Sequence, residues 1–261
     1  MPIVKKLIIA PLFLIIFSML IYSLNPLFSS YDLIFNLSLS TLIQLLTLSS
    51  LILLSSLLFV LFATLAQDWK IILPVGIVAS LIPLALVNPS LRIILTVGTL
   101  ASLFLTYLTL ESSLKSYLNF KPAVVLGPSI RHLSTLLVII LSMTFFLSIN
   151  KIIQEKGFEI PDSLIDSAFL PQITPEQIEL LKQNPDLLKQ AVKDQLQGVI
   201  KPYLGFVPTA LAVLLFITLE SIVSFLTIFI YPLLWLTFYV LEKTGFVKFT
   251  TEMRPVKKMV V

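Results

Sequence analysis

Long stretches of apolar residues, separated by short polar intervals, dominate the pattern of this chain. They cover residues 7–24, 42–65, 71–87, 93–110, 133–149 and, in a longer run, 206–242. Each is close to or above the roughly 20 residues that a helix needs to cross a bilayer. The apolar residues run continuously instead of alternating with polar ones, which favours helices over a transmembrane barrel. We therefore predict an all-α integral membrane protein with about six transmembrane helices.

The last apolar run does not fit a single simple span. As one helix, Phe206–Leu241 would be about 54 Å long, which is too long for one crossing and short for two crossings with a turn. Pro232 interrupts the run. We expect one span followed by a kinked interfacial helix that ends at Glu242. A hairpin of two spans is the alternative.

The longest polar interval, residues 150–205, lies between the fifth apolar run and the last. Thr174 and Gln177 match a capping box around Pro175, which indicates a helix start. Asn184, followed by Pro185, indicates a second start. Each helix would carry an apolar stripe. We expect a small extracytoplasmic helical segment whose partner-docking candidates are Ile178, Leu181, Leu188, Val192 and Leu196.

The distribution of Lys and Arg predicts how the chain is oriented. With six spans, one side carries the basic residues Lys5, Lys6, Lys70, Lys115, Lys121, Arg131 and those of the tail 243–261. The other side carries Arg92 and the lysines of the segment 150–205. Short loops follow the positive-inside rule most reliably. We predict a cell (plasma or inner) membrane protein with both termini in the cytoplasm. The basic residues serve this orientation, so we expect no nucleic-acid partner.

The composition excludes several kinds of site. Hydrophobic residues make up 57% of the chain and charged residues 12%, and there is no cysteine and a single histidine, His132. Disulfides, thiolate metal sites and histidine clusters within one chain are therefore excluded. The acidic residues within spans do not come in pairs, and no glycine-rich nucleotide loop is present. We predict that the protein is not an enzyme and binds no cofactor or metal.

Two neighbouring spans resemble each other in sequence. Residues 70–81 align with residues 92–103, and each copy carries a glycine followed four residues later by a serine. These helix-packing candidates are Gly76, Ser80, Gly98 and Ser102. Small residues at this spacing share one helix face and let two backbones approach closely. An internal duplication, as in many transporters, and a shared packing requirement both explain the likeness.

Glu220 is an acidic residue inside the last apolar run, and Gln44 is an amide inside the second. A charged carboxylate at the bilayer centre costs about 3 kcal/mol on insertion scales. No Lys or Arg lies within a span, so we expect serine, threonine or Gln44 to hydrogen-bond Glu220. This intramembrane polar candidate is a proton or cation site, a polar packing contact, or a residue at a hairpin turn.

Two functions from different classes agree with this pattern. The first is a scaffold or accessory subunit that presents the segment 150–205 to a membrane or extracytoplasmic partner, or to a second copy of the chain. The second is a small transporter or channel subunit that uses Glu220 as an intramembrane proton or cation site. The lipid bilayer is a partner in both.

Overall fold

The computed structural model describes residues 7–31, 38–117, 120–158 and 201–247, together with residue 193 and residues 197–199. The regular elements within these ranges are helices. They are α2 (Ala10–Ser23), α3 (Asn25–Ser29), α5 (Leu39–Ala66), α6 (Trp69–Leu86), α7 (Pro89–Ser116), α8 (Pro122–Lys156), the 3-10 helix η2 (Lys201–Tyr203) and α12 (Val207–Lys243). With α2 and α3 taken as one span, six helices are long and apolar enough to cross a membrane. The predicted all-α membrane fold is confirmed.

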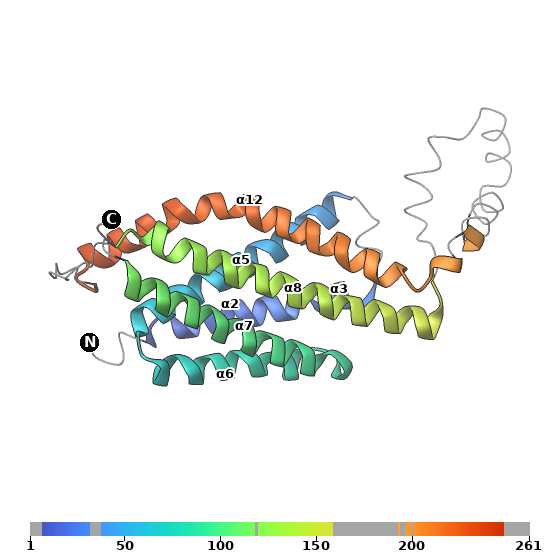
Figure 1. Cartoon of the computed structure of the whole chain (residues 1–261), viewed down its shortest axis with the longest axis horizontal. Helices are drawn as coiled ribbons and strands as arrows, with labels where there is room; N and C mark the ends of the chain where they lie inside the picture. The colour runs from blue at the N-terminus through green and yellow to red at the C-terminus, as the bar shows by residue number, and fades with distance from the viewer. Residues whose placement is uncertain are drawn as a thin grey trace, which may run out of the picture.

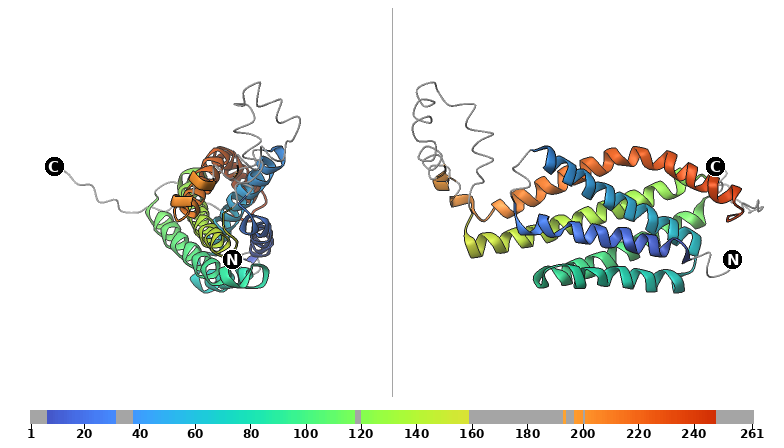
Figure 2. Two further views of the ribbon diagram at one scale, coloured as in Figure 1. Left: turned by 90° about the vertical axis from the view of Figure 1, so that its right-hand side faces the viewer. Right: turned by 180° about the vertical axis from the view of Figure 1, so that it is seen from behind.

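The spanning helices form one elongated bundle in which consecutive helices run antiparallel (Figure 1). Around the bundle, α6 packs on α7, α7 on α8, α8 on α12, α12 on α5, α5 on α2, and α2 on α6. The end-on view in Figure 2 shows this arrangement. In addition, α5 packs against α8 across the interior, and α5 has the largest buried share of the six helices.

The bundle has two distinct ends (Figures 1 and 2). The start of α2 at Ala10 and the end of α12 at Lys243 lie at one end, which we call the terminal end. The end of α8 and the 3-10 helix η2 lie at the opposite end, which we call the distal end. The connections after α5 and after α7 also lie at the terminal end, because the helices alternate in direction.

The helices extend beyond the limits that the apolar runs predicted. The polar interval between the apolar runs 93–110 and 133–149 is largely helical, because α7 continues to Ser116 and α8 begins at Pro122. Proline is favoured in the first turn of a helix, because backbone N–H groups there make no hydrogen bond within the helix and the missing N–H costs nothing. The added turn of α7 carries an i,i+4 pair, with Lys115 Nζ 2.6 Å from Glu111 Oε1. Such an ion pair stabilises the helix in a stretch where the residues are polar.

The polar interval after the first apolar run is also partly helical, because Asn25–Ser29 form α3. Pro26 lies in the first turn of this short helix, which its fixed φ angle favours. Similarly, the interval expected between the third and fourth spans belongs largely to α7, whose first residue is Pro89.

The last apolar run forms one continuous helix, and the hairpin alternative is therefore wrong. α12 passes through Pro232 and ends at Lys243, and Figure 1 shows it as a single curved helix. The helix is therefore not broken at Pro232, and the residues predicted as the last span and as a kinked interfacial helix belong to one continuous helix. Membrane helices tolerate an internal proline, because neighbouring groups and small local adjustments compensate for the lost hydrogen bond.

Three contacts show how α8, together with Phe120 just before it, lies against α12. The rings of Phe120 and Phe238 have centroids 5.2 Å apart. Farther along, a Cβ added to Gly127 would lie 2.9 Å from Tyr231 Cε1, so the ring packs directly over the glycine backbone. The third contact is a hydrogen bond from Thr135 to Glu220. Residue numbers rise along α8 as they fall along α12, as an antiparallel pair requires.

Large apolar side chains fill the interior and also cover the outside of the bundle. The fully buried ones include Phe13, Phe17, Phe59, Phe62 and Phe145. Many leucine, isoleucine and phenylalanine side chains are exposed on the outer faces of the same helices, and a soluble monomer rarely exposes so large an apolar surface. The chain is therefore a multi-pass helical membrane protein.

Candidate functional site

The carboxylate of Glu220 reaches from α12 to α8. Its Oε1 accepts a hydrogen bond from the Thr135 hydroxyl at 2.9 Å. Its Oε2 is buried and accepts no hydrogen bond. The salt bridges among the described residues are Lys115–Glu111 and Lys151–Glu155, so within that set Glu220 has no cationic partner. A buried acceptor without a partner costs stability unless a proton, an ion or water satisfies it.

Gln44 does not contribute to this contact. It is half-buried on α5 and lines a separate cavity of about 320 Å³ between α5 and the α2–α3 segment, together with Tyr22, Pro26 and Thr47. The hydrogen bond that we expected from serine, threonine or Gln44 comes from Thr135. The sequence could not select this threonine, because its place opposite Glu220 depends on how α8 and α12 are aligned.

The two copies of the repeated glycine and serine pair have different surroundings. A Cβ added to Gly98 would lie 2.9 Å from Ile140 Cγ2 of α8, so α7 and α8 approach closely at this point. A Cβ added to Gly76 would meet no atom within 4 Å. Both serines are buried, with exposed fractions of 2%. The close helix approach that the shared motif suggested is thus present at Gly98 and absent at Gly76.

The predicted docking residues belong to the segment 150–205. Ile178, Leu181, Leu188, Val192 and Leu196 all lie outside the described residues. The structure does describe the points where this segment leaves and rejoins the bundle. The side-chain amide of Gln197 donates a hydrogen bond to the carbonyl oxygen of Phe158 at 3.1 Å. The Phe158 ring packs against Tyr31 with 5.4 Å between centroids.

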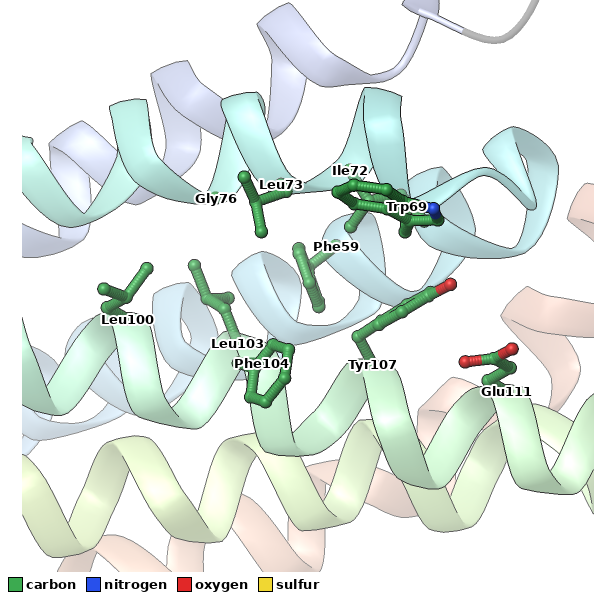
Figure 3. A pocket seen from close by; sticks show the side chains of 10 residues that line it. All are labelled: Phe59, Trp69, Ile72, Leu73, Gly76, Leu100, Leu103, Phe104, Tyr107 and Glu111. Atoms are coloured by element: carbon green, nitrogen blue, oxygen red, sulfur yellow. The ribbon is translucent and has the colours of Figure 1, made fainter.

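A second cavity, between α6 and α7, was not predicted from the sequence. Its volume is about 260 Å³, and Phe59 of α5 forms part of its wall. Figure 3 shows Leu73 and Gly76 on one side and Leu100 and Phe104 on the other. These side chains are apolar, so this part of the cavity offers dispersion contacts and no hydrogen bonds.

Polar groups gather at one end of the same cavity. Trp69 at the start of α6 and Tyr107 and Glu111 near the end of α7 lie together there (Figure 3). This end belongs to the terminal end of the bundle. Glu111 pairs with Lys115 at 2.6 Å, which brings one negative and one positive charge to the opening. The cavity is therefore amphipathic along its length.

The sequence does carry a signal for this cavity. In α7, steps of four, three and four residues connect Leu100, Phe104, Tyr107 and Glu111. In α6, steps of four and three residues connect Trp69, Leu73 and Gly76. Residues at these spacings share one helix face. The signal was missed because large residues at helical spacing in a membrane span usually serve packing.

Comparison with known proteins gives no identification: no family model, no curated protein and no solved structure matches the chain.

Proposed function

We propose that this protein is a scaffold or accessory subunit, without enzymatic activity, that presents the segment 150–205 to a protein partner or to a second copy of itself. The observation that carries the proposal is the hydrogen bond between Gln197 and Phe158. It holds the two ends of the intervening chain together at the distal end of the bundle. A segment whose two ends are held together beside the helix bundle is well placed to contact a partner.

The length of α8 supports the same proposal. With 35 residues it is about 52 Å long, well beyond the roughly 30 Å hydrocarbon core of a bilayer. Its last residues include Lys151 and Glu155, whose side chains are 3.8 Å apart and exposed. The end of α8 forms the first part of the segment 150–205 and would thus hold the rest of that segment clear of the lipid.

The proposed side of display is outside the cell membrane, with both termini in the cytoplasm. The terminal end carries Lys70, Lys115, Lys121 and Lys243, and the first turns of α8 add Arg131. The distal end carries fewer basic residues in short connections, with Arg92 the clearest one. The positive-inside rule then favours a cytoplasmic terminal end. The apolar positions Leu181 and Leu188 would contact the partner.

Crosslinking in intact membranes, followed by purification and mass spectrometry, tests this proposal. The variant Leu181→Lys/Leu188→Lys places charge on the two predicted stripes and is expected to lose the crosslinked partner or the crosslinked dimer. The control Lys182→Gln/Lys189→Gln alters neighbouring charged positions and is expected to keep it. Crosslinks that are the same in the native chain and in the lysine variant would reject the proposal.

A second candidate function is a small transporter or channel subunit, and Glu220 is the observation that favours it. Oε2 lies buried without a hydrogen-bond partner while Oε1 is held by Thr135. Ionisable residues within spans often mark proton or ion pathways. The variant Glu220→Gln keeps an acceptor for Thr135 and removes the ionisable group.

Proteoliposomes that contain a pH-sensitive dye test this second function. A potassium gradient with valinomycin drives proton uptake in the native protein if Glu220 carries protons. The variant Glu220→Gln is then expected to abolish the uptake, whereas Thr218→Val, on the same helix, is expected to retain it. Equal uptake by native protein and Glu220→Gln would exclude the proton-carrying role.

A further inference from the structure

We propose that the cavity between α6 and α7 binds one zwitterionic phospholipid, with an acyl chain inside the cavity and the head group at its polar opening. The cavity is built only from described helices and does not involve the segment 150–205. The inference therefore goes beyond the proposed function and stands without it.

The inner part of the cavity fits a hydrocarbon chain. Leu73, Leu100 and Phe104 offer apolar surface, and Phe59, with an exposed fraction of 1%, closes the wall behind them. An apolar cavity of about 150 Å³ is enough to take up benzene. At about 260 Å³ this cavity accepts a larger apolar group. No polar side chain in this part offers a hydrogen bond to a water-soluble ligand.

The length of the cavity matches one leaflet of the membrane. From Leu100 to Glu111 the helix α7 rises about 16 Å, which is half of the roughly 30 Å hydrocarbon core. Trp69 lies at the polar end, as tryptophan does at membrane interfaces. The cavity thus runs from the interface to the middle of the bilayer. A lipid of that leaflet can place its head at Trp69 and its chain beside Gly76.

The surroundings of the opening make a membrane lipid the natural occupant. Trp69 and Phe104 have exposed fractions of 57% and 52% on the outer face of the bundle. In a membrane-spanning helix pair this face borders lipid. The cavity is therefore filled from the bilayer by a molecule already present there at high concentration.

Charge at the opening favours a zwitterionic head group. Lys115 Nζ and Glu111 Oε1 are 2.6 Å apart, so charges of both signs lie at the opening, and the nearby Asp68 carboxylate adds a second negative charge. A head group with an ammonium and a phosphate can place its ammonium at Glu111 and its phosphate at Lys115. The Trp69 ring offers a further attractive face for the ammonium. An anionic head group would match Lys115 alone and would face the Glu111 carboxylate.

Gly76 keeps the inner part of the cavity open. A Cβ at this position would meet no atom within 4 Å, so a larger side chain can enter the cavity without displacing another helix. The variant Gly76→Leu is thus expected to fold and to fill the space of the acyl chain. Ala101 of α7 is exposed and does not line the cavity, so Ala101→Leu is the matched control.

Quenching of tryptophan fluorescence by brominated lipids tests the proposal. The chain contains two tryptophans, Trp69 at the opening and the exposed Trp235 on α12. The variants Trp235→Phe and Trp69→Phe each leave one reporter, and the full chain is reconstituted into vesicles of equal parts phosphatidylethanolamine and phosphatidylglycerol. Bromine is placed on the acyl chains of either lipid, so that the overall composition stays the same.

We expect brominated phosphatidylethanolamine to quench Trp69 about twofold more strongly than brominated phosphatidylglycerol, since specificity is a difference between two affinities. Trp235, which faces ordinary surrounding lipid, is expected to show no such preference. In the Trp235→Phe background, Gly76→Leu removes the preference at Trp69 and Ala101→Leu retains it.

Three results would overturn the proposal. They are equal quenching of Trp69 by the two lipids, stronger quenching by phosphatidylglycerol, and a preference that survives Gly76→Leu. The first two are read from chains with the native cavity and so do not depend on how a cavity variant folds. Circular dichroism and gel filtration check the folding of Gly76→Leu and Ala101→Leu.

Discussion

The hydrogen bond between Thr135 and Glu220 contributes to the stability of the bundle because few other groups can satisfy the carboxylate. The Thr135 hydroxyl lies 2.9 Å from Glu220 Oε1, and the surrounding lipid offers no competing donor. Hydrogen bonds between membrane helices contribute about 0.6 kcal/mol on average. The second oxygen of Glu220 has no hydrogen-bond partner, so the loss of Thr135 would leave the whole carboxyl group unsatisfied.

We therefore predict that Thr135→Val lowers the free energy of unfolding by about 1 kcal/mol, because it removes the donor and preserves the shape of the side chain. The control is Thr218→Val, since the Thr218 hydroxyl bonds only to the carbonyl of Leu214 on its own helix. Thermal unfolding in detergent measures both. A loss of stability that is no greater for Thr135→Val than for Thr218→Val would contradict the prediction.

The sequence identified Glu220 but not its partner, and the reason is geometric. A carboxylate inside an apolar run is visible in the sequence alone. Its partner lies 85 residues away and depends on the rotation and sliding of α8 against α12. The same limit applies to Gln44, which shares the polar character of Thr135 but lines a different cavity.

At the scale of helices, α6 and α7 show that similar sequences need not make similar contacts. α7 packs between α6 and α8, and Gly98 lies where α8 approaches, with Ile140 against it. α6 contacts α7 on one side and α2 on the other, and Gly76 borders the cavity. The two glycines therefore differ in what a methyl group would meet.

We predict opposite effects from adding that methyl group. Gly98→Ala places a Cβ 2.9 Å from Ile140, and β-branched Ile140 has few alternative rotamers. We expect a loss of about 1 to 3 kcal/mol from overpacking. Gly76→Ala enters open space and is expected to be neutral or to stabilise by up to about 1 kcal/mol through helix propensity. Thermal unfolding of the two variants in the same detergent measures the change in stability. Equal changes for Gly98→Ala and Gly76→Ala would contradict the prediction.

The antiparallel pairing of α8 and α12 gives a second prediction at this scale. The chain has no cysteine, so introduced cysteine pairs can be crosslinked without background. We expect a short bifunctional thiol reagent, which spans more than a direct disulfide does, to crosslink Phe120→Cys/Phe238→Cys, because the two native rings are in contact with centroids 5.2 Å apart. Phe120→Cys/Phe225→Cys is the control, since Phe225 lies 13 residues away along α12, about 20 Å. Crosslinking of the control pair alone would show a different alignment of the two helices.

The sequence predicted the interiors of the helices better than their ends. Apolar runs located each span, because lipid requires them. The extension of α7 to Ser116 and the start of α8 at Pro122 depend on a charged pair and on proline position, which hydropathy does not detect. The continuity of α12 through Pro232 was missed because proline ends most helices in water.

At the scale of the whole molecule, basic residues lie at both ends of the bundle, but they flank connections of different length. Lys70, Lys115 and Lys121 flank short connections at the terminal end. At the distal end Arg92 follows a short connection, whereas Lys151 and Lys201 flank the long one. The proposed orientation places the terminal end in the cytoplasm. One exposed residue at each end is suitable for chemical labelling: Ser116 at the terminal end and Gln154 at the distal end.

We predict that a membrane-impermeant maleimide labels Gln154→Cys on intact cells and leaves Ser116→Cys unlabelled until the cells are permeabilised. The native chain has no cysteine, so it serves as the control for labelling that does not depend on an introduced cysteine. Labelling of Ser116→Cys alone on intact cells would invert the orientation and place the segment 150–205 in the cytoplasm.

The unequal lengths of the helices have a consequence for the bilayer itself. α6 has 18 residues, about 27 Å, whereas α12 has 37 residues, about 55 Å. A hydrophobic helix shorter than the local membrane thins the lipid beside it, at a modest cost for each ångström of mismatch. The bilayer would therefore be thinnest along the α6 face. Two copies that turned these faces toward each other would share one thinned patch, so membrane elasticity alone would draw them together.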